Sequence, residues 1–213
     1  MKAVLVHELN RASVEDVQLA PPKAYEVKIK MAAAGVCHSD LSVLNGTIPH
    51  PLPVVLGHEG AGVVEEVGEG VSHTKPGDHV VMSFVPNCGR CFHCVRHEAF
   101  LCRATPRGGA MLDGTQRLSQ GGKPLAAFCS LGNMAEYVVC PAISVVPVSK
   151  DIPLDVAALI GCGVTTGVGA VINTAAVEPG STVAVFGCGG VGIATIQGAR
   201  IAGAARIFAV EIS

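Results

Sequence analysis

Four cysteines lie close together in the chain, as Cys88-x-x-Cys91-x-x-Cys94-x7-Cys102. Four thiolates at such spacing can enclose one tetrahedral Zn²⁺ and leave no open coordination position, which is the arrangement of a structural metal site. The alternative is that the four are reduced thiols buried in a core. The segment that holds them is charged, which argues against burial, since it contains Arg90, Arg96, His97 and Glu98. The spacing therefore predicts a structural zinc site.

A second set of metal-binding residue types is spread along the chain, in Cys37-His38-Ser39-Asp40, Gly57-His58-Glu59 and Gly161-Cys162-Gly163. A catalytic zinc takes three protein ligands and keeps a fourth position open, and a mixed set of cysteine and histidine meets that need. No spacing rule links the three segments. The spacing alone therefore favours buried free cysteines and a core histidine over a second metal site.

Glycines form the third pattern, Gly187-x-Gly189-x-x-Gly192, with a further glycine at Gly190. They follow an apolar segment, 182–186, and open a predicted helix, so their backbone and the helix N-terminus can receive a pyrophosphate. Glu211 ends the next apolar segment, where its carboxylate can accept both hydroxyls of a ribose and repel a 2′-phosphate. The pattern predicts binding of NAD rather than NADP; the alternative is a tight strand-to-helix turn without a ligand.

Short strands are expected to position the two sets of metal-binding residues. Apolar or alternating segments at 2–6, 26–32, 60–67, 77–82 and 136–139, separated by Gly and Pro, predict a β-barrel or sandwich-like domain up to about residue 150. The polar, glycine-rich segment 106–124 predicts a surface loop.

The pattern changes after Asp151. Asp151-Ile152-Pro153 predicts a helix start. A strand at 182–186, a helix at 191–202 and a strand at 206–210 then predict a parallel pair joined by a crossover helix.

Composition excludes several classes of protein. The 213 residues are 49% hydrophobic and 15% charged, which rules out disorder for most of the chain. The formal charge is −2, with no basic surplus or stripe, so nucleic acid is not an expected partner.

The start of the chain, MKAVLVHELN, lacks the pattern of a secretory signal, so we expect the reducing cytoplasm. Nine cysteines there favour metal binding or catalysis over disulfides. The least polar stretch, 154–177, contains Asp155, Asn173 and several glycines, and is a poor membrane span.

Taken together and in this order, the motifs resemble the medium-chain, zinc-dependent alcohol dehydrogenase family over essentially the whole chain. The resemblance implies an α/β protein with a β-rich, GroES-like catalytic domain at 1–163 and an incomplete Rossmann cofactor domain at 164–213. It implies a zinc-dependent oxidoreductase that transfers a hydride between a small alcohol or aldehyde and NAD(H). It also implies two zinc ions per intact subunit and a dimer or tetramer.

The resemblance also assigns roles to single residues. Cys37, His58 and Cys162 would bind the catalytic zinc, and Cys88, Cys91, Cys94 and Cys102 the structural zinc. Ser39 would relay the substrate proton, with Asp40 and Glu59 beside the metal. His38 would meet the cofactor pyrophosphate, Thr166 the nicotinamide, and Phe84 would form a wall of the substrate pocket.

Two features depart from well-known family members. Ser42 stands where many members carry the histidine that ends the proton relay. The segment 111–115 resembles a bacterial branch that includes aryl-alcohol dehydrogenases and dehydrogenases of S-(hydroxymethyl)thiol adducts. The zinc-free reductase branch of the same fold is disfavoured, because both metal-binding sets are present.

The main alternative function is a zinc-stapled binding module without catalysis. One strand–helix–strand unit cannot cover both faces of a parallel sheet, so either the rest is missing or another chain completes the sheet. Of the two we expect a fragment of a longer protein, with little activity alone.

Overall fold

The computed structural model describes residues 1–104 and 106–212. They form two compact units, which divide between Ala158 and Leu159. The strands of the first unit are β1 (Lys2–Glu8), β2 (Arg11–Asp16), β3 (Gln18–Leu19), β4 (Glu26–Ala34), β5 (Val54–Val55), β6 (Gly60–Val67), β7 (His79–Met82), β8 (Leu118–Gln120), β9 (Lys123–Ala127), β10 (Tyr137–Pro141) and β11 (Val145–Pro147). Its helices are α1 (His38–Leu44) and α2 (Leu154–Ala158), with 3₁₀ turns η1 (Cys94–Arg96), η2 (Ala99–Leu101), η3 (Arg107–Gly109), η4 (Phe128–Ser130) and η5 (Ala142–Ser144).

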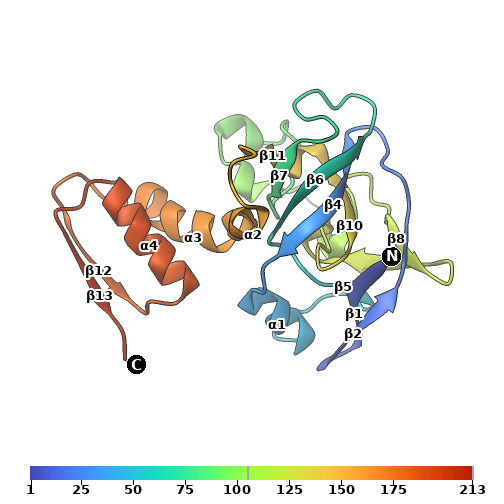
Figure 1. The fold of residues 1–213 in the computed structure, drawn as a ribbon, viewed down its shortest axis with the longest axis horizontal. Coiled ribbons are helices and arrows are strands. Elements are labelled where there is room, and N and C mark those ends of the chain that lie inside the picture. The colour runs from blue at the N-terminus through green and yellow to red at the C-terminus, as the bar shows by residue number, and fades with distance from the viewer. Residues whose placement is uncertain (105, 213) are drawn as a thin grey trace. The chain divides into compact units, whose positions relative to one another are not determined.

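Two curled sheets build the first unit (Figure 1). One has the strand order β2-β1-β5-β9-β8-β3 and the other β10-β4-β6-β7-β11. All pairings are antiparallel except β5 with β9. The β-rich domain predicted from the sequence is therefore confirmed, and β6 has the predicted bounds.

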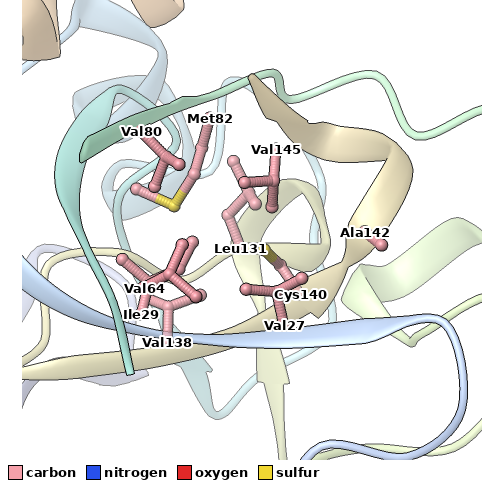
Figure 2. Close-up of a cluster of buried hydrophobic side chains, with 10 residues drawn as sticks. All are labelled: Val27, Ile29, Val64, Val80, Met82, Leu131, Val138, Cys140, Ala142 and Val145. Atoms are coloured by element: carbon pink, nitrogen blue, oxygen red, sulfur yellow. The ribbon is translucent and has the colours of Figure 1, made fainter. Parts of the chain in front are cut away.

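Apolar residues at alternate strand positions form the main core of this unit, because alternate side chains point to the same face of a strand. Val27 and Ile29 of β4 meet Val80 and Met82 of β7 in this way. Figure 2 shows the whole cluster, which consists of Val27, Ile29, Val64, Val80, Met82, Leu131, Val138, Cys140, Ala142 and Val145. A core of this kind holds the strand ends in fixed positions.

The prediction of a surface loop over 106–124 is wrong for its second half. Residues 118–120 form β8, and Lys123 opens β9. Leu118 is buried in a second apolar cluster. Arg117 is also buried, and its Nε donates to the carboxylate of Glu26 at 2.8 Å, which compensates for the buried charge. The polar, glycine-rich composition of segment 106–124 indicates neither the ion pair nor the strand pairing.

The second unit contains η6 (Leu159–Gly161), α3 (Gly163–Gly169), a π-helical turn η7 (Ala170–Thr174), β12 (Thr182–Phe186), α4 (Gly190–Ile201) and β13 (Arg206–Val210). β12 and β13 pair in parallel, from Thr182↔Arg206 to Phe186↔Val210, so the predicted strand–helix–strand unit is confirmed (Figure 1). Helices α3 and α4 approach closely at Gly167, where a Cβ would stand 2.6 Å from that of Ala194.

Within the described residues, no single helix is long and apolar enough to cross a membrane, although the bent pair Leu154–Gly161 and Gly163–Thr174 passes that test when counted together.

Candidate metal centres and glycine turn

The four-cysteine cluster lies in the loop that follows β7, around η1 and η2. Its ligand atoms all lie within 4.8 Å of one another. The Sγ atom of Cys91 is 3.5 Å from that of Cys94 and 3.9 Å from that of Cys102, and the sulfurs of Cys88 and Cys94 are 4.0 Å apart. A tetrahedron with Zn–S bonds of about 2.3 Å has edges of about 3.8 Å. The cluster therefore fits a zinc ion.

Backbone amides around the cluster favour a thiolate in it. Hydrogen bonds from the backbone N–H groups of Cys94 and Arg103 lower the pKa of Cys91 to about 6. Burial, together with hydrogen bonds from Cys91 and Cys102, raises the pKa of Cys94 to about 11. Backbone hydrogen bonds to the sulfurs therefore favour ionisation within the cluster, and metal binding requires ionised thiols.

The first two candidate ligands of the dispersed set come together inside the first unit. Cys37 is the N-cap residue of α1, and His58 lies between β5 and β6. Their ligand atoms lie within 4.8 Å of each other. The spacing alone favoured a core histidine and an unrelated buried thiol. That interpretation gives no reason for the two side chains to lie so close together.

Asp40 connects the two segments. Its Oδ2 accepts a hydrogen bond from the backbone N–H of Cys37 at 3.1 Å. Its Oδ1 accepts one from the backbone N–H of Gly57 at 3.0 Å and lies 3.3 Å from Nδ1 of His58. Asp40 is 2% exposed, so water does not compete for these bonds. One carboxylate therefore fixes the positions of a thiol and an imidazole that are 21 residues apart (58 − 37).

Electrostatic interactions and hydrogen bonds shift the pKa values of His58 and Cys37 in the direction opposite to the shift that burial causes. Burial lowers the pKa of His58, but the hydrogen bond and charge of Asp40 outweigh it, with help from the Cys37 thiolate, so the pKa of His58 is raised above its usual value. Burial raises the pKa of Cys37, but hydrogen bonds from Ser39 and the charge of His58 outweigh it, so the pKa of Cys37 is lowered. The pair is arranged to hold a thiolate.

Two phenyl rings flank the imidazole of His58 edge-on. The ring centroid of Phe84, which follows β7, is 5.7 Å away, and that of Phe128, in η4, is 5.2 Å away. Phe84 was predicted from the resemblance as a pocket wall. Phe128 was not predicted, because it is distant in the sequence from every motif and no local pattern distinguishes it from a core residue.

The remaining predicted residues of the first unit surround this pair. The Ser39 hydroxyl is 3.7 Å from the sulfur of Cys37. On the same helix, Nδ1 of His38 lies 3.3 Å from the hydroxyl of Ser42. Glu59 is buried, and its backbone oxygen accepts a hydrogen bond from Gly35 at 2.8 Å.

In the second unit, Cys162 is the N-cap residue of α3, and its carbonyl oxygen accepts the N–H of Thr166 at 2.9 Å. Thr166 is exposed on that helix. The roles that the resemblance gives these two residues stay predictions.

The glycine turn joins β12 to α4. Gly187 has φ of +90°, which favours glycine. A Cβ on Gly192 would stand 1.9 Å from the carbonyl oxygen of Gly187, so the turn requires glycine there. A Cβ on Gly189 or Gly190 would meet no described residue within 4 Å, so that side of the turn is open.

Glu211 holds the turn from the end of β13. Its carboxylate accepts the backbone N–H of Cys188 at 2.7 Å and that of Ile212 at 2.8 Å. The N–H of Cys188, followed by that of Ile212, lowers the pKa of Glu211. A carboxylate that is ionised at neutral pH therefore stands beside the open side of the turn.

All nine cysteines carry free thiols. Among the three that were assigned no ligand role, Cys140 is fully buried in the main core, and burial raises its pKa to about 12. It packs as a small apolar residue.

Comparison with known proteins gives consistent results. Residues 23–150 match the family described as "Alcohol dehydrogenase GroES-like domain". An alcohol dehydrogenase zinc-binding domain protein from Burkholderia ambifaria is 41% identical, with a TM-score of 0.94. Benzyl alcohol dehydrogenase from Acinetobacter calcoaceticus is 33% identical, with a TM-score of 0.91. Both alignments cover 100% of this chain, but only 59% and 58% of those chains, respectively. An alcohol dehydrogenase from Thermus sp. ATN1 is 34% identical over 98% of this chain and 57% of its own, with a TM-score of 0.79.

Proposed function

The chain belongs to the medium-chain, zinc-dependent alcohol dehydrogenases, and from this premise we propose that it takes part in hydride transfer between a small alcohol or aldehyde and NAD(H). The observation that carries the proposal is the pairing of Cys37 with His58 through Asp40. This arrangement goes beyond what a zinc-stapled binding module needs, because such a module uses only the four-cysteine cluster.

We propose that Cys37 and His58 hold the catalytic zinc with Cys162 as the third ligand, which is why the catalytic domain is assigned to 1–163. Two sulfurs and one nitrogen are a ligand set that suits zinc and leaves one position open. A zinc ion in such a site supplies Lewis acidity toward the oxygen of an alcohol or aldehyde, and NAD supplies the hydride acceptor. The four-cysteine cluster would hold the second, structural zinc.

The protein's own residues prepare this site. Asp40 accepts a hydrogen bond at Nδ1 of His58, which leaves Nε2 with its lone pair available for a metal. The same carboxylate fixes the backbone of Cys37. The ligands are therefore oriented before a metal binds, which reduces the conformational cost of binding it.

Ser39 is the proposed carrier of the substrate proton, because its hydroxyl is next to the sulfur of Cys37. Position 42 holds a serine and not a histidine, so the proposed path of the proton beyond Ser39 has no histidine there. The hydroxyl of Ser42 faces His38 instead. Glu59 is proposed to act beside the metal as a buried carboxylate.

The substrate class that we propose is an aromatic primary alcohol or the matching aldehyde. Phe84 and Phe128 supply aromatic walls beside His58 and exclude water from it. Aromatic rings prefer edge-to-face or offset partners, which these walls can provide to a substrate ring. A relative that covers the whole chain is named benzyl alcohol dehydrogenase.

For the cofactor, we propose that the strand–helix–strand unit is the start of a Rossmann domain. The open side of the glycine turn, at Gly187, Gly189, Gly190 and Gly192, would receive the pyrophosphate together with His38. Glu211 would accept the hydroxyls of the adenosine ribose, and Thr166 would pack beside the nicotinamide.

The 213-residue chain is proposed to turn over slowly by itself. Its parallel sheet has two strands and leaves Phe186 and Phe208 exposed, whereas parallel sheets are normally covered on both faces. The dimer or tetramer and the cytoplasmic location expected from the resemblance stay predictions.

Metal stoichiometry of the 213-residue chain tests the proposal without requiring turnover. We expect two zinc ions in the unmodified chain, one in Cys162→Ala and one in Cys91→Ala. Cys140→Ala is the matched control, because Cys140 is a packing residue, and it should keep both ions. A single zinc ion in the unmodified chain that Cys162→Ala retains would support the zinc-stapled module instead.

A further inference from the structure

Asn133 is completely buried, yet its amide has no partner. Its exposed fraction is 0%, and among the described residues neither Oδ1 nor Nδ2 makes a hydrogen bond. Buried polar groups without partners are rare in folded proteins and destabilise them. A residue that destabilises the fold in this way is expected to have a function besides packing.

The amide of Asn133 lies along the turn that carries His58. The backbone N–H of Asn133 donates to the carbonyl oxygen of Gly57 at 3.2 Å. A Cβ built on Gly57 would stand 2.4 Å from Oδ1, and one built on Gly60 would stand 2.7 Å from Nδ2. The two ends of the amide therefore contact the two glycines that enclose His58 and Glu59.

Both glycines are needed for this contact. Gly57 has φ of +100°, a conformation that disfavours other residues, and neither glycine has a side chain to fill the space beside its Cα. The amide of Asn133 occupies that space. Asp40 holds the same turn through the N–H of Gly57 and through Nδ1 of His58. The turn is thus held by a carboxylate and by a buried amide.

We propose that Asn133 is a positioning residue that fixes the Gly57–Gly60 turn so that His58 is oriented for metal binding. A planar amide fits between two glycine Cα atoms, whereas the branched methyl groups of leucine, a side chain of similar length, are thicker and displace the turn. The inference rests on the proposed metal site at Cys37 and His58. Loss of such supporting contacts typically lowers metal affinity 10–100-fold.

Zinc release from the 213-residue chain to a chromophoric chelator tests the inference. The release phase that is missing in Cys162→Ala identifies the mixed cysteine–histidine site, and the phase from the four cysteines is the internal control. We expect Asn133→Leu and Asn133→Ala to accelerate the first phase by about 10–100-fold and to leave the second unchanged. Ser144→Ala is the matched control, since Ser144 is also fully buried and its hydroxyl has no partner in the described part of the chain, but it lies in η5.

Stability distinguishes positioning from simple packing. Asn133→Leu removes the unpartnered amide, which offsets the strain of the displaced turn, so the melting temperature of the metal-free chain should stay near that of the unmodified chain; Asn133→Ala leaves a cavity and should lower it. If both variants nevertheless release zinc faster and shift the absorption bands of the Co²⁺-loaded mixed site, a packing role cannot explain the result.

Two outcomes would overturn the inference. Zinc release that follows the melting temperature, with Asn133→Leu behaving as the unmodified chain, would show that Asn133 only packs. An unchanged Co²⁺ spectrum in both variants would show that it does not orient His58. If the unmodified chain has no zinc phase sensitive to Cys162→Ala, the proposed metal site itself fails, which is a distinguishable result.

Discussion

Oδ1 of Asp40 lies 3.3 Å from Nδ1 of His58, and both side chains are buried. The carboxylate comes from α1 and the imidazole from the turn before β6, so their contact joins two segments that the sequence leaves unrelated. The same carboxylate also accepts backbone hydrogen bonds from Cys37 and Gly57. Its removal therefore affects both of the proposed metal ligands of the first unit at once.

The variant Asp40→Asn should lower zinc affinity at the mixed site by about 10–100-fold, because His58 loses the acceptor that fixes its ring and tautomer. Competition with a chelator measures the effect. Asp78→Asn is the control, since Asp78 accepts a hydrogen bond from Lys75 in a turn and touches neither ligand. Equal zinc affinities in the two variants would contradict the role of Asp40.

The variant Arg117→Met should lower the free energy of unfolding of the first unit by about 3–5 kcal/mol, because it leaves the buried carboxylate of Glu26 without its counter-charge. Urea unfolding measures the loss. The double variant Glu26→Gln/Arg117→Met should recover part of it, since no buried charge remains. A double variant that is less stable than Arg117→Met would disprove this account.

Stability should also fall in acid through Asp113. Burial opposes its ionisation, but hydrogen bonds from Lys23, Thr115 and Arg117 outweigh that effect and hold the pKa of Asp113 well below its usual value. A carboxyl group with a lower pKa in the folded state stabilises the fold above its unfolded pKa of about 4, and this contribution is lost as the pH falls further. Asp113→Asn should therefore flatten the decline in unfolding free energy below pH ~4. A decline of the same steepness in the variant would assign it to other carboxylates.

At the glycine turn, Gly192→Ala should prevent normal folding of the second unit, because its Cβ would collide with the carbonyl oxygen of Gly187. Limited proteolysis and circular dichroism measure this. Gly190→Ala is the matched control. It lies in the same helix, and its Cβ meets none of the residues that the structure describes within 4 Å, so alanine there should stabilise the helix by about 0.4–1 kcal/mol. Equal protease resistance of the two variants would contradict the contact.

Much of the molecule follows from short-range patterns in the sequence. The bounds of β6, β12 and β13 follow from runs of apolar and β-branched residues, since a strand forms from neighbours along the chain. The four-cysteine cluster was also predictable, because all of its ligands lie within one loop and their spacing limits how the loop can fold. The glycine turn has the same local character.

Other features depend on residues that are far apart in the sequence. The pairing of Cys37 with His58 results from the positions of α1 and of the turn before β6, which the strand order of the two sheets determines. The segment 106–124 reads as a polar loop, yet the ion pair of Arg117 with Glu26 and the pairing of β8 bury part of it. No local pattern contains that information.

The sequence by itself determined the kinds of residues available for metal binding and which segments form strands, because these depend on side-chain chemistry and on periodicity. Only the tertiary structure decided that Asp40 holds His58 and that Phe84 and Phe128 flank it. It also placed the unpartnered amide of Asn133 against the glycines on either side of His58. The physical reason is that hydrogen bonding and packing depend on distances in space. Those distances are determined by how the chain folds and not by the separation of residues along the sequence.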